Sequence, residues 1–229
     1  NRNQPTAGTN YNSFNAAYAA LRCGIAGPIV FNVVAGSGPY NEQVNMTYVQ
    51  GTSAVNTVTF NGNGETITFL STNTAQRAVF KLSGTDYFIF DSLNVVPQGS
   101  TTSDFGYGFH LTNGADSNVI RKCTITLNTT STSTNFAGIV NSAGDTPTTS
   151  GLNESDGNII EKNTIIGGYY GITMVGSTTN AVGNNKIIDN TIRDFYLYGT
   201  YHLGNFNTLI ESNRITRPNR ATPTTFYGC

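Results

Sequence analysis

The sequence predicts an all-β protein, a coil of short stacked strands with one short helix near its start. Three observations predict this fold. Asn, Thr, Ser and Gly make up 104 of the 229 residues, a composition typical of turn-rich chains. Thirteen Phe and twelve Tyr supply a buried core. From about Phe105 onward, two short motifs recur with a period near 30 residues. Leu, Glu and Lys are scarce, which argues against a helical bundle.

The one helix is predicted over Ser13–Arg22. Ser13 is suited to cap its N-terminus, and Gly24 is suited to end it in the left-handed conformation. The apolar side chains recur at the i, i+3, i+4, i+7 spacing of a single helix face: Phe14, Ala17, Tyr18 and Leu21. We expect this short amphipathic helix to cover the open end of the β structure that follows.

The β region begins with runs of β-forming residues separated by Gly, Asn and Ser turns. These runs are Ile29–Val34, Thr57–Phe60, Thr66–Leu70, Ala78–Leu82 and Tyr87–Val95.

Two motifs interleave in strict order after this region. The first is an aromatic residue or Ala, then Gly, then a β-forming residue; its glycines are Gly108, Gly138, Gly171, Gly199 and Gly228. The second is apolar-x-x-Asn-x-Ile, seen at 120–125 (with Cys in place of Asn), 160–165, 187–192 and 210–215. A period near 30 with several short strands predicts a coil with three strands per turn, in which each strand stacks on its counterpart in the next turn.

The second motif predicts a ladder of stacked asparagines at one bend of the coil. Asn tolerates the backbone of a sharp bend, and stacked Asn side chains can hydrogen-bond from turn to turn. The isoleucine of each motif is expected to point inward. The predicted rungs of this structural ladder are Cys123, Asn163, Asn190 and Asn213.

These motifs resemble those of the right-handed parallel β-helix, the pectate-lyase-like superfamily. The start of the chain, Tyr11–Leu21 with Gly27–Val33 and Tyr40–Val44, looks like the N-terminal part of large secreted surface proteins of Bacteroidetes type. The resemblance implies an extracellular or outer-cell-surface location. Because the superfamily holds polysaccharide lyases, glycosidases, adhesins and passive stalks, the fold alone does not choose an activity.

We expect one β-helix domain over residues 1–229, with a cap helix and lead-in (1–26), irregular first turns (27–104) and regular repeats (105–229). The last motif, at Tyr227–Cys229, starts a new turn. A coil cut there leaves strand edges open. We therefore expect the chain to be part of a longer polypeptide with further domains.

Charge and composition exclude two classes of protein. The formal net charge is −1, so a nucleic-acid binder driven by phosphate neutralisation is not expected. No apolar run approaches the length of a membrane span.

Cys23, Cys123 and Cys229 show no metal-ligand spacing. They are consistent either with buried small side chains plus one terminal thiol, or with a single disulfide.

The sequence predicts no catalytic residues and no metal site of recognisable spacing. The residues expected to face outward on successive turns alternate in charge or are neutral, which is typical of a solvated β surface. No cofactor is predicted. Ca²⁺ remains an option only in the 144–158 insertion, where the candidate ligands are Asp145, Glu154 and Asp156.

Aromatic residues recur at one point of successive turns, and we call them the aromatic strip: Tyr107, Phe136, Tyr169, Tyr170, Tyr196 and Tyr198. They are consistent either with an internal stack or with an exposed surface that stacks on sugar rings. Our leading interpretation is a non-catalytic, secreted or cell-surface β-helix module with an adhesive or glycan-contacting role. Its expected partner is a polysaccharide or cell-surface glycan. A polysaccharide lyase or hydrolase and a passive stalk are the alternatives.

Overall fold

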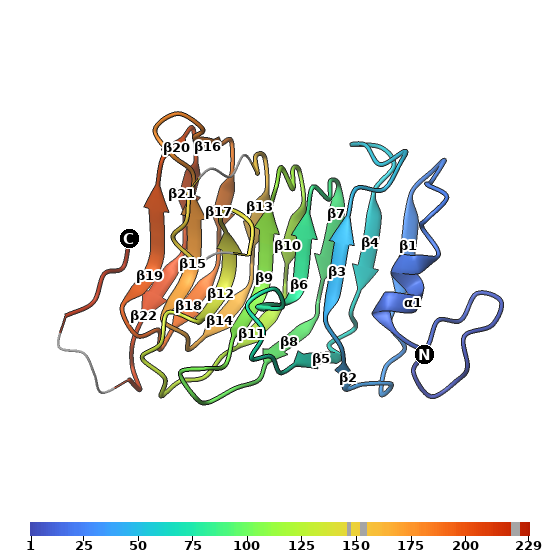
Figure 1. Cartoon of the computed structure of the whole chain (residues 1–229), viewed down its shortest axis with the longest axis horizontal. Coiled ribbons are helices and arrows are strands. Elements are labelled where there is room, and N and C mark those ends of the chain that lie inside the picture. Colours follow the sequence, from blue (N-terminus) through green and yellow to red (C-terminus); the bar gives the residue numbers. More distant parts are fainter. Residues whose placement is uncertain (146–147, 152–154, 221–224) are drawn as a thin grey trace.

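The computed structural model describes residues 1–145, 148–151, 155–220 and 225–229. The chain winds as a β-solenoid in which three parallel sheets run the length of the molecule (Figure 1). Successive turns add one strand to each sheet, and every strand pairs with its counterpart in the next turn, as the repeat period predicts. The predicted all-β parallel coil is therefore confirmed.

The strands fall into three long sheets and one short one. The first sheet has the order β1–β4–β7–β10–β13–β17–β21 (Ile29–Asn32, Val58–Asn61, Phe88–Asp91, Val119–Arg121, Ile159–Glu161, Lys186–Ile188, Leu209–Glu211). The second has the order β2–β5–β8–β11–β14–β18–β22 (Tyr40–Asn41, Thr66–Phe69, Asn94–Pro97, Thr124–Thr126, Thr164–Ile166, Thr191–Arg193, Arg214–Thr216). The third has the order β3–β6–β9–β12–β15–β19 (Val44–Thr47, Ala78–Ser83, Gly106–Thr112, Phe136–Asn141, Tyr170–Val175, Tyr198–Leu203). A pair, β16 (Val182–Gly183) and β20 (Asn205–Phe206), forms the fourth.

Helix α1 (Phe14–Ala19) lies against the first turn at the N-terminal end of the coil (Figure 1). The Ser13 hydroxyl accepts a hydrogen bond from the backbone N–H of Ala16 (2.9 Å). The Glu42 carboxylate accepts two more, from the N–H groups of Phe14 and Asn15. The Phe14 ring packs on Phe60 and closes the interior. The helix is shorter than predicted because its residues after Ala19 form a turn that ends at Gly24 (φ +80°).

This helix is far too short to cross a bilayer, and no helix in the described part of the chain has the length and apolarity of a membrane span.

The run of β-forming residues Tyr87–Val95 is not a single strand. The structure divides it into β7 and β8, which belong to different sheets. Ser92 adopts a left-handed backbone (φ +56°) and turns the chain sharply between them. The same two-residue bend recurs in later turns, with Lys122, Lys162, Asp189 and Ser212 in the left-handed conformation immediately before the ladder positions.

The four ladder residues lie at this bend, between the first and second sheets. The backbone N–H of Cys123 donates to Oδ1 of Asn163 (2.9 Å), and that of Asn163 donates to Oδ1 of Asn190 (3.0 Å). Asn190 repeats the contact with Asn213 (2.9 Å). Each asparagine also donates from Nδ2 to a backbone carbonyl of the preceding turn. The Cys123 thiol takes the amide's place by donating to the Phe90 carbonyl (3.6 Å).

The glycines of the first motif face the isoleucines of the second across the interior. A Cβ built on Gly138 would lie 2.5 Å from the Gly171 carbonyl oxygen and 2.6 Å from Cγ2 of Ile165. Gly108 and Gly171 meet Ile125 and Ile192 in the same way. The two motifs therefore mark the two sides of one close contact between the third and second sheets.

The interior changes character along the coil. Its first turns are filled by stacked phenylalanines, including Phe60 and Phe90, whose ring centroids lie 5.9 Å apart at an angle of 8°. Later turns replace them with isoleucine columns, in which Ile125, Ile165 and Ile192 are fully buried. At the C-terminal end Ile210 is 38% exposed, because β21 lies at the edge of its sheet.

Candidate functional site

Six tyrosines gather on the outer face of the third sheet near the C-terminal end of the coil. We call them the tyrosine cluster: Tyr169, Tyr170, Tyr196, Tyr198, Tyr201 and Tyr227. Tyr170 and Tyr198 are the first residues of β15 and β19 and are register partners. The side chains of adjacent strand residues point to opposite faces, so these tyrosines point outward while the following glycines face the interior.

Two consecutive glycines form the turn that leads into the tyrosine cluster. Gly167 (φ +81°) and Gly168 (φ +75°) turn it from β14 to β15 within three residues, and Tyr169 follows directly. In the next turn the backbone N–H of Tyr196 donates to the Gly168 carbonyl (2.7 Å), and that of Leu197 donates to the Tyr169 carbonyl (3.1 Å). These backbone bonds fix Tyr196 beside Tyr169.

The rings of the cluster make two kinds of contact. Tyr170, Tyr198 and Tyr227 form a near-parallel stack, with centroid separations of 5.4 and 5.0 Å. Their faces therefore cover one another. Tyr169 and Tyr196 are both half-buried and lie 5.2 Å apart at an angle of 48°. Their tilted rings leave surface that the stack does not cover.

A groove of about 460 Å³ adjoins the cluster. It is lined by Thr129, Thr130, Ile166, Arg193, Asp194, Asn219 and Arg220. Arg220 joins the groove to the tyrosines, because its guanidinium lies 5.2 Å from the Tyr196 ring centroid and donates to the carbonyls of Gly168 and Asp194. The groove thus combines cationic and short hydroxyl side chains, and Arg220 connects it to the Tyr196 ring.

Asp194 is the one carboxylate of this groove and is ionised. Burial acts to raise its pKa, but hydrogen bonds from Asn219 and the Arg193 guanidinium together lower the pKa below its usual value. The Arg193 Nη1 to Asp194 Oδ2 distance is 2.9 Å. Asp194 therefore serves to hold Arg193 and the segment carrying Asn219 in place.

Tyr107 and Phe136, the first two residues of the predicted aromatic strip, are fully buried. The Tyr107 ring packs edge-on against His110, and with Ala137, Val140 and Tyr170 it forms a second apolar cluster outside the main core. Of the predicted strip, only Tyr169, Tyr196 and Tyr198 are half-exposed. Within the aromatic strip, the surface open to an external ligand is therefore confined to the last turns.

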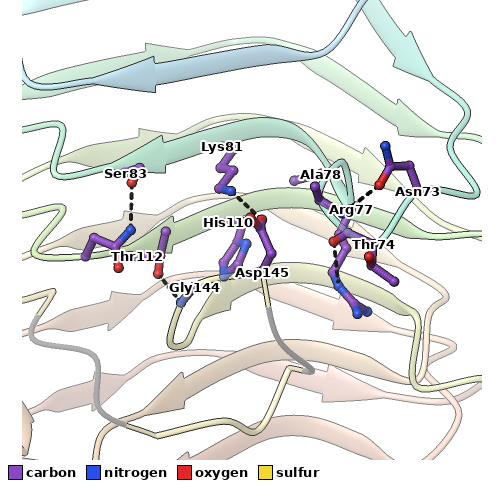
Figure 2. A network of polar contacts seen from close by, with 12 residues as sticks. Asn73, Thr74, Arg77, Ala78, Lys81, Ser83, His110, Thr112, Gly144 and Asp145 are labelled. Carbon is purple, nitrogen blue, oxygen red and sulfur yellow. Dashed lines mark hydrogen bonds and ion pairs between the residues drawn. The ribbon is translucent and has the colours of Figure 1, made fainter.

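A second polar cluster, not predicted from the sequence, lies on the same face beneath the insertion after β12. Figure 2 shows Lys81 from β6, His110 from β9 and Asp145 from the insertion pointing toward one another. Lys81 and Asp145 form an ion pair. His110 Nε2 lies 3.1 Å from the Ser142 hydroxyl. Burial and the positive charge of Lys81 lower the pKa of His110 to about 4, so the imidazole is neutral at pH 7.

This cluster fastens the insertion to the coil. The N–H of Gly144 also donates to the Thr112 hydroxyl (2.7 Å), seen in Figure 2. Because His110 and Ser142 are only 1% and 0% exposed, this histidine–hydroxyl pair has no open face for a substrate. Lys81 and Asp145 are 64 residues apart in the chain, and the sequence offers no signal that pairs them.

The structure also contains a second asparagine ladder, which was not predicted from the sequence. It runs through Asn118, Asn158 and Asn185 at the bend between the third and first sheets. The backbone N–H of Asn118 donates to Oδ1 of Asn158 (2.9 Å), and that of Asn158 donates to Oδ1 of Asn185 (2.8 Å). A signal was available, because each of these asparagines stands two residues before an interior isoleucine, the spacing of the first ladder.

Of the three candidate calcium ligands, Glu154 lies outside the described residues. Asp145 pairs with Lys81, and Oδ1 of Asp156 accepts a hydrogen bond from the N–H of Gly183 (2.7 Å). In the described ranges, no three His, Cys, Asp or Glu side chains come together as a metal-binding group. All three cysteines are free thiols, with Cys123 buried and the other two exposed.

A coil of three parallel sheets with asparagine ladders at its bends defines the class: a right-handed parallel β-helix of pectate-lyase-like type. Within this class, the chain belongs to the NosD family, described as periplasmic copper-binding protein (NosD), whose sequence profile matches residues 41–217. That description places the family outside the cytoplasm. No curated protein matches the chain.

The described residues of this chain do not fit a copper site. Copper is bound by imidazole, thiolate and thioether groups, usually three or more together. His110 is bound to Ser142, and burial raises the pKa of Cys123 to about 12, which keeps its thiol protonated. His202 is the register partner of Met174, but the Met174 sulfur already accepts a hydrogen bond from Asn141 (3.4 Å). Within the described ranges, His202 belongs to no group of three or more His, Cys, Asp or Glu side chains.

Proposed function

We propose that this chain is a non-catalytic module of a secreted or cell-surface β-helix protein, and that it contacts glycans through Tyr169 and Tyr196. The observation that carries the proposal is the placement of these half-exposed tyrosines beside the groove that holds Arg220. Sugar rings present C–H groups that pack on tilted aromatic rings, and their hydroxyls bond to Thr, Asn and Arg side chains.

The rigidity of the coil supports this role. The backbone of Tyr196 and Leu197 is hydrogen-bonded to the preceding turn, so the rings are held in place before a ligand arrives. A surface of this kind loses little conformational entropy on binding. The buried His110–Ser142 pair beneath the insertion lacks an open face, which favours a binding surface over a reaction centre.

The test is a glycan-array screen followed by calorimetry on any glycan that binds. Tyr169→Ala and Tyr196→Ala are each expected to weaken binding about threefold to tenfold, the loss of one aromatic contact. Tyr48→Ala is the matched control, because Tyr48 is 63% exposed and lies outside the tyrosine cluster. The glycan affinity of this variant is expected to equal that of the wild type.

Three results would reject the proposal. If the variants lower stability but bind normally, the tyrosines are structural. If no glycan binds, a passive stalk becomes the better account. If uronate polymers are cleaved to unsaturated products, the chain is a lyase.

A further inference from the structure

Tyr169 and Tyr196 are held side by side across two successive turns of the coil. Their ring centroids lie 5.2 Å apart at an angle of 48°, and both side chains are half-buried. The backbone bonds from Tyr196 to Gly168 and from Leu197 to Tyr169 fix this pairing. No side-chain hydrogen bond engages either phenol among the described residues. Both side chains keep part of their surface exposed, so the phenols can be reached from solvent.

We propose that Tyr169 and Tyr196 form an oxidative modification site, at which a peroxidase-type oxidant joins the two rings into a dityrosine cross-link. Each phenol loses one electron and one proton to give a phenoxyl radical. The two radicals couple through a new C–C bond between ring carbons ortho to the oxygens. Each of these carbons then loses its proton and each oxygen regains one, so both rings become aromatic phenols again. Hydrogen peroxide accepts the two electrons and two protons and leaves as two water molecules, so the step balances.

The geometry favours this pair over Tyr107, Tyr170 and Tyr48. Tyr198 and Tyr201 lie equally close, but both belong to β19, so their coupling would join no two turns. Tyr170 is only 6% exposed and its ring is stacked against Tyr198 at 12°, which hinders the edge-to-edge arrangement of the product. Tyr107 is fully buried. Tyr48 is well exposed but has no aromatic contact among the described residues. Tyr169 and Tyr196 combine access, proximity and a tilt that lets ring edges meet.

Proximity also favours coupling within one chain. Groups held next to each other have an effective concentration of at least millimolar, so at about 10 μM protein the internal reaction is favoured about a hundredfold over coupling between chains. The product would connect the turn of β14 and β15 to the turn of β18 and β19 covalently. Such a bond restrains the unfolded chain as a disulfide does, and it does not depend on glycan binding.

The experiment treats the whole chain with peroxidase and hydrogen peroxide, then isolates the monomer and digests it with trypsin. Cleavage at Lys162, Lys186, Arg193 and Arg214 releases peptides 163–186 and 194–214. We expect a product in which these peptides are joined with loss of two hydrogen atoms, and fragment ions that place the bond at Tyr169 and Tyr196. The monomer is expected to gain dityrosine fluorescence.

Tyr169→Phe and Tyr196→Phe keep the rings but remove the phenols, so each is expected to fold normally and to reduce this product to background. Tyr48→Phe is the matched control and is expected to leave the yield unchanged. The proposal is overturned if the joined peptides are absent, if they persist in either variant, or if dityrosine appears only in cross-linked dimers. Unchanged melting temperatures of the Phe variants show that any loss is chemical and does not come from unfolding.

Discussion

A buried asparagine in this coil satisfies two backbone groups of the preceding turn at once. Asn163 accepts from the N–H of Cys123 and donates to the carbonyl of Ile120. A sharp bend leaves such groups without strand partners, and water cannot reach them because Asn163 is 1% exposed. The amide side chain is the shortest neutral group that both donates and accepts in these directions.

Asn163→Ala is therefore expected to destabilise the protein by about 1–3 kcal/mol for each backbone group left unpaired. Urea denaturation measures the loss as a lower midpoint. Asn3→Ala, at an exposed position outside both ladders, serves as control and should change little. Cys123→Asn should be tolerated, because its Nδ2 can donate to the Phe90 carbonyl as the thiol does. A normal midpoint for Asn163→Ala would contradict the ladder's role.

His110 makes stability depend on pH. Its folded pKa of about 4 lies below the ordinary value of 6.5, because burial and Lys81 disfavour the charged form while Asp145 partly offsets them. Between these two values the unfolded chain binds a proton that the folded chain does not. The stability due to neutral His110 is thus complete above pH 6.5 and is lost as the pH falls toward 4.

The expected loss between pH 7.5 and 5 is about 2 kcal/mol from this residue alone. Denaturation curves of the wild type and of His110→Gln at both pH values measure it, because contributions of the carboxylates are common to both proteins. The free energy of unfolding of the variant should fall by about that much less between the two pH values. If both proteins lose the same free energy of unfolding between pH 7.5 and 5, the imidazole is not held neutral in the fold.

At the scale of elements, the separation of the second and third sheets is set by glycine facing isoleucine. Gly108, Gly138 and Gly171 each face an isoleucine methyl and the carbonyl of the next glycine in the column. The repeated motifs of the sequence are thus complementary surfaces, one per sheet. A side chain at the glycine position would force the sheets apart over several turns.

Gly138→Ala is expected to cost about 3 kcal/mol or more, because the nearest atom to the new Cβ is a backbone oxygen that cannot move alone. Thermal unfolding measures the effect. Gly27→Ala is the matched control: no atom lies within 4 Å of its Cβ position, and its backbone does not require glycine. If both variants melt alike, close approach of the sheets is not what requires glycine.

At the scale of the molecule, the coil is a row of similar turns whose differences decide what each region does. Phenylalanine stacks fill the first turns and α1 closes them. The middle turns carry the insertion, fastened by Lys81 and Asp145. The last turns carry the half-exposed tyrosines and the groove. A repeating scaffold therefore presents distinct surfaces at different turns, as is typical of solenoids.

The sequence by itself determined the parallel coil, the position of the helix and the inward isoleucines, because each depends on local periodicity and on motifs repeated from turn to turn. It did not separate β7 from β8, since a left-handed Ser92 leaves no compositional mark.

Only the tertiary structure decided which aromatics are covered. Tyr107 and Tyr198 both stand directly before the glycine of their motifs, yet Tyr107 is buried and Tyr198 half-exposed. Burial on the outer face depends on which loop folds over which turn. The pairing of Lys81 with Asp145 and the seating of Arg220 against Tyr196 likewise join residues far apart in the chain, and no local pattern encodes such contacts.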